Sequence, residues 1–296
     1  MELDYFVLDV FTETVLKGNP LAVVMNTADL ATEQMQAIAR EFNLSETTFV
    51  ERRAPAIEQA EGVRVRIFTA QEELNFAGHP TLGTASVLKM YAPETVAGDT
   101  VTLAENVGPI PVRFTGPALF GEMTQRDPEF GAELDRAEVA RLTGLEIEDL
   151  HPALPPQIVS TGTAFAIVVL RSTGALARLS VDQQQATTWL RDRGARWFYV
   201  LGPTGAQDLS GAPQWRARMQ FSGGEDPATG SAAGCAISYL VMHGAAKSGT
   251  RTHVLQGVEI GRPSHLLLSA QKELTRVTDV RVGGSTVLVA VGKLFL

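Results

Sequence analysis

His79-Pro-Thr-Leu-Gly-Thr-Ala85 and Asp226-Pro-Ala-Thr-Gly-Ser-Ala232 are two versions of one segment, separated by nearly half of the 296-residue chain. Two further pairs of segments repeat in the same order, residues 18–24 with 162–168 and residues 63–67 with 215–219. Because the three pairs keep their order and almost the same spacing, the sequence predicts an internal duplication. The chain is expected to fold as two similar halves.

Strands and helices alternate in the predicted α/β pattern. Residues 5–11, 21–25 and 63–68 have the profile of strands, and residues 81–91 that of a helix. The apolar spacing of Thr32–Phe42 predicts an amphipathic helix that ends at Asn43. A stretch rich in proline and glycine, 108–131, separates the halves. The predicted domains are therefore 1–117, with Glu46 and His79, and 118–296, with Asp226 and Ser231. The last strand is a candidate to return to the first half.

Composition limits the class of protein. The chain is 45% hydrophobic and 20% charged, with a net charge of −8, which is typical of a globular protein and unfavourable for binding nucleic acid. It has no apolar run of the roughly 18 residues that cross a membrane. A single cysteine, Cys235, excludes an internal disulfide and a cysteine-based metal cluster, and is expected to be a small core residue. A cytoplasmic protein is expected.

The duplicated segments are the first candidates for function. Proline fits the first position of a helix, so His79 and Asp226 are expected at or beside the N-caps of two helices. In a duplicated fold the two loops are expected to face each other across a cleft, and such interfaces favour small-molecule sites. The small residues Gly230 and Ser231 leave backbone N–H groups accessible to a carboxylate. The alternative is that Asp226 is only a cap and His79 a packed loop residue.

Glu46 is the candidate general base. It lies in Asn43-Leu-Ser-Glu-Thr-Thr-Phe-Val50, between the amphipathic helix and a strand, where a cleft can desolvate it. The alternative is a solvated surface glutamate, which is the commoner situation for this residue type. The second half offers Arg196 near the matching place. A carboxylate in only one half favours removal and return of a proton on one face over a two-base inversion.

Cofactor motifs are missing from the sequence. The segments beginning at Gly78 and Gly224 lack the Lys-Ser/Thr ending of a phosphate loop, and no Gly-x-Gly-x-x-Gly fingerprint is present. The five histidines show no spacing typical of metal ligands. Neither a metal nor an organic cofactor is therefore expected.

Five motifs together resemble the PhzF family of phenazine-biosynthesis proteins. They are Gly18-Asn-Pro-Leu-Ala-Val23, Asn43-Leu-Ser-Glu-Thr47, Phe76-Ala-Gly-His-Pro-Thr-Leu-Gly83, Gly224-Glu-Asp-Pro-Ala-Thr-Gly-Ser-Ala232, and Gln256-Gly with Gly261-Arg-Pro-Ser264. The resemblance implies a diaminopimelate-epimerase-like fold, with two halves that each wrap a mixed, barrel-like sheet around a central helix. Those epimerases use two cysteines where this sequence has His79 and Asp226.

The resemblance also implies a reaction, the cofactor-free isomerisation of trans-2,3-dihydro-3-hydroxyanthranilate by a homodimer. By similarity, Glu46 moves the proton, and His79 and Asp226 assist and bind polar groups of the substrate. Gly78, Gly230 and Ser231 complete the substrate-binding set, with Ser231 and the Gly230 amide on the carboxylate. Asn19 receives no chemical role. Two alternatives stay open: a cofactor-independent racemase or epimerase of small amino or hydroxy acids, and a non-catalytic protein that binds a small carboxylate.

Overall fold

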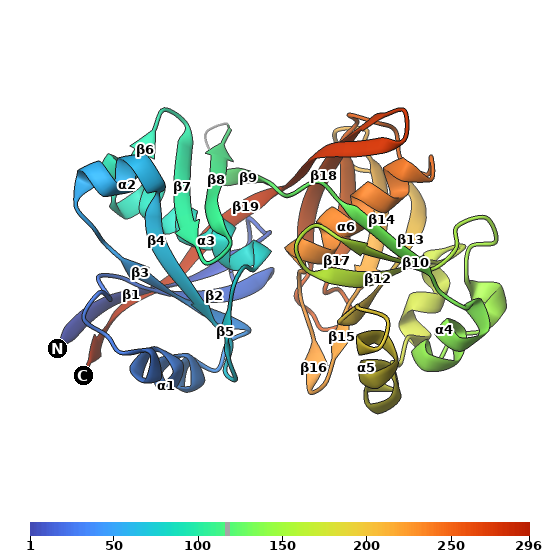
Figure 1. The fold of residues 1–296 in the computed structure, drawn as a ribbon, viewed down its shortest axis with the longest axis horizontal. Helices are drawn as coiled ribbons and strands as arrows, with labels where there is room; N and C mark the ends of the chain where they lie inside the picture. Colours follow the sequence, from blue (N-terminus) through green and yellow to red (C-terminus); the bar gives the residue numbers. More distant parts are fainter. Residues whose placement is uncertain (116–118) are drawn as a thin grey trace. The chain divides into compact units, whose positions relative to one another are not determined.

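The computed structural model describes residues 1–115 and 119–296, which form two compact units (Figure 1). Unit 1 consists of Met1–Thr124 and Gly283–Leu296, and unit 2 of Gln125–Val282. The domain boundary expected between residues 117 and 118 lies outside the described residues. The end of the last strand belongs to unit 1.

Unit 1 combines a mixed sheet with three α-helices among its described residues. Its elements are β1 (Glu2–Val10), β2 (Asn19–Val24), α1 (Thr32–Phe42), β3 (Glu46–Glu51), α2 (Pro55–Glu61), β4 (Val63–Phe68), β5 (Glu73–Leu74), α3 (Gly78–Tyr91), a 3-10 turn (Pro93–Thr95), β6 (Val96–Ala97), β7 (Thr100–Glu105), β8 (Gly108–Phe114), β9 (Phe120–Thr124) and the end of β19 (Arg276–Phe295).

Eight strands of unit 1 close into a ring. In order around it, β19, β1 and β2 are antiparallel, β2 and β3 parallel, β3 and β4 antiparallel, and β4 and β7 parallel. Strands β7, β8 and β9 continue antiparallel, and β9 pairs with β19 to complete the barrel. A closed ring leaves no free sheet edge, so each of these strands is paired on both sides.

Unit 2 repeats the pairing pattern of unit 1. Its elements are β10 (Glu129–Glu133), α4 (Arg136–Thr143), a 3-10 turn (Ile147–Asp149), β11 (Gln157–Ser160), β12 (Ala164–Val169), a 3-10 turn (Thr173–Arg178), α5 (Gln183–Arg191), β13 (Trp197–Gln207), β14 (Pro213–Arg218), β15 (Gln220–Phe221), β16 (Gly224–Glu225), α6 (Gly230–Met242), β17 (Thr252–Gln256) and β18 (Ser264–Glu273).

The order of parallel and antiparallel pairs confirms the predicted duplication. Strands β10, β11 and β12 are antiparallel, β12 and β13 parallel, β13 and β14 antiparallel, β14 and β17 parallel, and β17 and β18 antiparallel. The series β19-β1-β2-β3-β4-β7-β8 in unit 1 has the same order of orientations. Each parallel pair is joined through a helix, as parallel strands require.

Helices α3 and α6 are the cores of their units. Every residue from Gly78 to Leu88 is buried, and α3 contacts β1, β2, β3, β7, β8 and β9 (Figure 1). A helix that is small and apolar on all sides can be surrounded by a sheet in this way. Gly83 has to be small, because a Cβ atom there would lie 2.5 Å from Cδ2 of Leu21 on β2. Helix α6 is likewise buried and contacts β11, β12 and β18.

The fold confirms the sequence prediction of two α/β halves, each with a mixed sheet around a central helix. Thr32–Phe42 is a helix with its C-cap at Asn43, as predicted, because Asn43 adopts the left-handed conformation that ends helices. The strand at Val63–Phe68 also has the predicted bounds. In the described part of the chain, no helix is both long and apolar enough to cross a membrane.

Candidate active site

Glu46 and His79 lie side by side in unit 1. Glu46 is the first residue of β3, where it pairs with Leu21, and His79 is the second residue of α3. Nε2 of His79 is 3.3 Å from Oε2 of Glu46, and the two side chains are 5% and 17% exposed. Glu46 is therefore not the solvated surface glutamate of the alternative interpretation. A carboxylate that is shielded from water beside an imidazole can exchange protons with a bound substrate.

The His79 ring is oriented from its opposite side. Nδ2 of the fully buried Asn19 is 3.1 Å from Nδ1 of His79, and the Pro20 backbone also hydrogen-bonds the ring. Proline has no backbone N–H, so the Pro20 carbonyl accepts this bond from a ring N–H. Burial lowers the pKa of His79 to about 3, although the Pro20 hydrogen bond opposes the shift. The imidazole is therefore neutral at pH 7.

The counterpart of Glu46 in unit 2 is an aromatic residue. Strand β13 begins at Trp197, which pairs with Phe165 of β12 just as Glu46 pairs with Leu21 of β2. Arg196, the residue expected near this place, immediately precedes the strand, and its guanidinium lies 4.2 Å from the centroid of the Trp197 ring. The matching position thus holds an indole in place of a carboxylate.

The predicted helix starts were wrong in both halves. Helix α3 begins at Gly78 after an Ala77 N-cap, so His79 lies inside the first turn. Helix α6 begins at Gly230 after a Thr229 N-cap, so Asp226 lies before the helix and does not cap it. At Asp226, side-chain hydrogen bonds take the place of helical backbone bonds, so α6 starts later than predicted. Asp226 is therefore not the N-cap residue of α6.

Asp226 lies in a short loop that is held by Gln256, the last residue of β17. Nε2 of Gln256 donates to the Asp226 carbonyl at 2.8 Å and to Oγ1 of Thr229 at 2.9 Å. The Thr229 hydroxyl donates to Oδ2 of Asp226 at 2.7 Å, and the Asp226 N–H donates to the Met219 carbonyl. Asp226 itself is half-buried, so its carboxylate is both fixed and accessible.

The three residues expected to bind substrate lie at helix starts. Gly78 is the first residue of α3, and Gly230 and Ser231 are the first two residues of α6. The N–H groups of a helix's first turn have no partners within the helix and favour negative charge. Ser231 is half-buried while Gly230 is buried.

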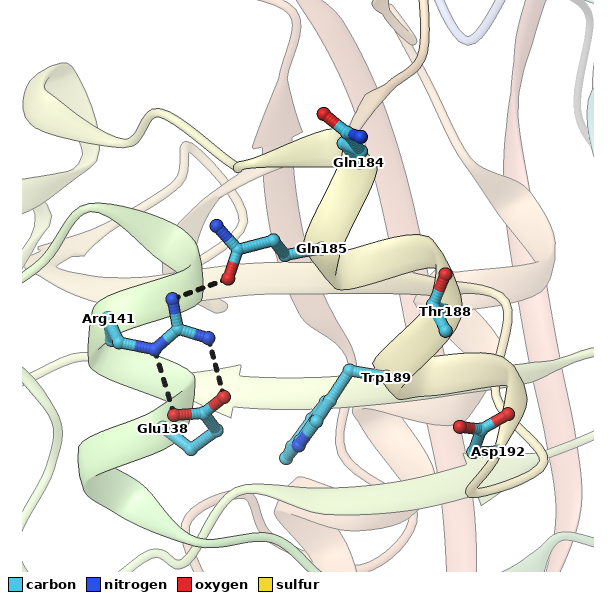
Figure 2. Close-up of a pocket in the computed structure, with 7 residues that line it drawn as sticks. All are labelled: Glu138, Arg141, Gln184, Gln185, Thr188, Trp189 and Asp192. Carbon is cyan, nitrogen blue, oxygen red and sulfur yellow. Dashed lines mark hydrogen bonds and ion pairs between the residues drawn. The ribbon is translucent and has the colours of Figure 1, made fainter.

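Two other features do not contribute to this site. Figure 2 shows a pocket between α4 and α5 where Arg141 hydrogen-bonds Glu138 and Gln185, and none of the predicted site residues lines it. Cys235 is fully buried in α6, and burial raises the pKa of its thiol to about 11. It is a core residue, as predicted, and its thiol is unreactive at neutral pH.

Three side chains that hold the helix starts had no predicted role. Asn19 was given no role although it contacts His79, and Gln256 was noted only as part of a motif. Glu105, the last residue of β7, was not noted; its Oε1 lies 2.6 Å from Oγ1 of Thr81 in the first turn of α3. Each contact joins residues far apart in the sequence. The motifs quoted above contain Asn19 and Gln256 and were the only available signal.

Two units with the same order of strand pairs, one of them with a buried carboxylate–imidazole pair at its central helix, are suited to moving protons on a small substrate. The model of the phenazine biosynthesis-like protein family matches residues 8–292 of the chain. The chain belongs to this PhzF family and is an isomerase.

Relatives and solved structures agree with this assignment. The chain is 36% identical to an uncharacterized isomerase from Mesorhizobium japonicum and 35% identical to trans-2,3-dihydro-3-hydroxyanthranilate isomerase from Pseudomonas aeruginosa, in each case over 99% of both chains. A PhzF-family crystal structure from Bacillus anthracis superposes with a TM-score of 0.86 at 23% identity, over all of both chains. A hydroxyproline epimerase from Agrobacterium vitis shares the fold at 10% identity, with a TM-score of 0.61 over 99% of this chain and 92% of that one. The predicted epimerase-like fold is thereby confirmed.

Proposed function

We propose that the protein shifts a proton between two carbon atoms of a small cyclic amino or hydroxy acid, such as trans-2,3-dihydro-3-hydroxyanthranilate. The sheltered contact between Glu46 and His79 carries the proposal, because it offers one carboxylate in a desolvated setting. The relative from Pseudomonas aeruginosa that is named for this isomerisation supports the substrate class.

The Glu46 carboxylate accepts a proton from a ring carbon of the substrate, and the resulting carboxylic acid returns it further along the conjugated system. Protons and electrons balance, so substrate and product are isomers. The neutral His79 lies beside the carboxylate and orients it before transfer. A single carboxylate favours this shift over a racemase that uses one base on each face, because the matching strand start in unit 2 carries Trp197.

Unit 2 supplies binding groups in this proposal. Asp226 binds the amino or hydroxyl group of the substrate and assists the transfer. Ser231 and the Gly230 N–H bind its carboxylate, since the first turn of α6 favours an anion. Gly78 is proposed to contact the substrate through its backbone. A protein that only binds a carboxylate has no need of the Glu46–His79 pair.

A screen of small cyclic and linear amino acids in deuterium oxide, followed by proton NMR, tests the proposed function. The expected result is isomer formation or exchange of a carbon-bound proton with at least one cyclic β-hydroxy or amino acid. Chelator treatment is expected to leave the rate unchanged, because no cofactor takes part in the proposed reaction. Binding without exchange for every compound would favour the non-catalytic alternative.

Two broader expectations belong to the same proposal. The family resemblance suggests a homodimer, and light scattering should then give about twice the 31.8 kDa mass of one chain at micromolar concentration. A single species at the mass of one chain would contradict it. A cytoplasmic location is proposed from the single cysteine of the sequence.

A further inference from the structure

The side-chain amide of Gln256 uses all of its hydrogen-bonding capacity. Its oxygen accepts from the Tyr199 hydroxyl at 3.0 Å and from the Thr229 N–H at 3.2 Å. Its NH2 group donates to the Asp226 carbonyl and to Oγ1 of Thr229. Gln256 and Tyr199 are both fully buried, so water does not compete for these bonds.

These partners fix the direction of every bond. A backbone N–H can only donate, so the Thr229 N–H requires the oxygen of the amide on its side. The NH2 group must then face Oγ1 of Thr229, which accepts a hydrogen bond and has one proton left to give. That proton goes to Oδ2 of Asp226, 2.7 Å away. A directed chain therefore runs from Tyr199 through Gln256 and Thr229 to the Asp226 carboxylate.

The backbone after Gln256 reinforces the same contact. Gly257 has a φ of +76°, and a Cβ atom there would lie 2.4 Å from the Arg262 carbonyl oxygen and 2.7 Å from that of Pro227. Only glycine lets the end of β17 come so close to the backbone of the Asp226 loop. The Gln256 side chain and the backbone at Gly257 thus hold the same loop, which contains Asp226.

Unit 1 has an equivalent arrangement. Glu105 ends β7 and Gln256 ends β17, and the pairing of these strands with β4 and β14 places the two residues at matching positions. Glu105 contacts Oγ1 of Thr81, which also lies 2.7 Å from the Ala77 carbonyl oxygen. The duplicated fold thus uses the same strand end twice to reach a threonine at a helix start. In unit 2 the chain of bonds ends on the Asp226 carboxylate.

We propose that Gln256 is a positioning residue for the isomerase, which holds the Asp226–Thr229 loop and orients the Asp226 carboxylate through the Thr229 hydroxyl. The inference rests on the proposed function for its catalytic consequence, but the positioning itself can be measured without a substrate. Gln256→Met removes both N–H donors and the acceptor oxygen of the side chain while keeping a similar volume. Gln36→Met is the matched control, because Gln36 likewise donates to a loop carbonyl, that of Thr69, but in unit 1.

Hydrogen–deuterium exchange with mass spectrometry tests the positioning directly. In Gln256→Met, peptides that contain residues 226–230 should exchange about tenfold faster, as expected from the loss of these hydrogen bonds. The same peptides should be unchanged in Gln36→Met. Unchanged exchange at residues 226–230 in Gln256→Met overturns the inference, whatever the protein's activity.

A double-mutant cycle tests whether Gln256 acts through Asp226. On the isomerisation substrate, Gln256→Met should lower kcat about 10-fold to 100-fold with little change in KM, the size expected when a catalytic group is misplaced. The same substitution should add little in an Asp226→Asn background. An equal loss in both backgrounds contradicts positioning through Asp226.

The outcomes separate this inference from the proposed function. If the wild-type protein isomerises no tested substrate, the proposed function fails, and hydrogen exchange alone decides whether Gln256 holds the loop. If Gln256→Met does not fold, Gln256→Glu keeps the shape and the acceptors but loses both donors, and it should show the same local exchange. Tyr199→Phe, which leaves both donors in place, should have a smaller effect than either.

Discussion

The two central helices start differently although their sequences repeat. In unit 1, α3 begins before His79, and the imidazole is buried in the first turn. In unit 2, α6 begins after Asp226, and the carboxylate lies in a half-buried loop. The unit 1 arrangement gives a neutral imidazole beside a carboxylate. The unit 2 arrangement gives a charged group that stays within reach of solvent, so the duplication has produced two different chemical environments.

The matching strand ends show how the difference is maintained. Burial raises the pKa of Glu105 to about 8, and the Thr81 hydroxyl donates to Oε1 of Glu105 and also lies 2.7 Å from the Ala77 carbonyl oxygen. Gln256 donates to Thr229, and Thr229 donates to the Asp226 carboxylate. In unit 1 the threonine joins a strand end to the backbone of a helix start, while in unit 2 the threonine joins it to the proposed catalytic side chain.

The largest expected effect concerns the residue at the start of β3, whose counterpart in unit 2 begins β13. Glu46→Gln keeps the shape of the side chain but removes its basicity, so kcat should fall by about 10²–10⁴-fold. Glu51→Gln, at the opposite end of β3, is the control and should retain wild-type activity. Steady-state kinetics of both folded variants provide the measurement. Near-normal turnover by Glu46→Gln would remove the functional distinction between the units.

The next effect concerns Glu105 and the pH dependence of stability. Its folded-state pKa is raised to about 8 from 4.5, so the folded state keeps a proton that the unfolded state has lost, and this residue's contribution to stability falls between about pH 4.5 and pH 8. Glu105→Gln removes this dependence. Its free energy of unfolding should match wild type near pH 4 and exceed it by up to a few kcal/mol at pH 9.

Urea denaturation at several pH values measures this difference. The groups that act on Glu105 are the Thr81 hydroxyl and the Arg64 guanidinium, both of which favour the ionised form against the larger effect of burial. If the free energies of unfolding of wild type and Glu105→Gln change in parallel with pH, Glu105 is ionised in the folded protein, which contradicts the raised pKa.

Asp226→Asn tests the second chain of bonds. Asparagine keeps an oxygen for the Thr229 hydroxyl but carries no charge, so turnover should fall about 10-fold to 100-fold, the size of a hydrogen bond to a charged group. Stability should change little, because Asp226 is not the helix cap. Kinetics with thermal unfolding as the companion measurement distinguish the two effects. Unchanged turnover would make the Asp226 loop a structural feature only.

Ser231→Ala has the smallest expected effect. The hydroxyl is one of several groups proposed to hold the substrate carboxylate, so its loss should weaken binding by roughly 1 kcal/mol, about fivefold in KM, with kcat preserved. Titration calorimetry with a substrate analogue provides the measurement. A large loss of kcat with unchanged KM would move Ser231 from binding to chemistry.

Sequence patterns predicted the parts of the fold that depend on neighbouring residues. The Thr32–Phe42 helix follows from apolar spacing and an asparagine C-cap, and the Val63–Phe68 strand follows from alternation. The start of α3 was placed two residues late, because Pro80 was assigned to the first helical position and in fact occupies the third. Proline is tolerated there since the first N–H groups of a helix need no internal partner.

The site was only partly predictable for a physical reason. Glu46 and His79 could be singled out from motifs, and the family resemblance paired them. The residues that orient His79 and Asp226 could not be found from periodicity or spacing. The contacts of Asn19 with His79 and of Gln256 with Asp226 arise only when strands and helices distant in sequence pack together.

A substrate deuterated at the carbon that loses its proton tests the central claim most directly. With wild-type protein, NMR should show the label leaving its original carbon as the isomer forms. With Glu46→Gln, the label should stay in place over the same period, while Asp226→Asn should only slow its loss. Departure of the label at the wild-type rate in Glu46→Gln would contradict the assignment of Glu46 as the base.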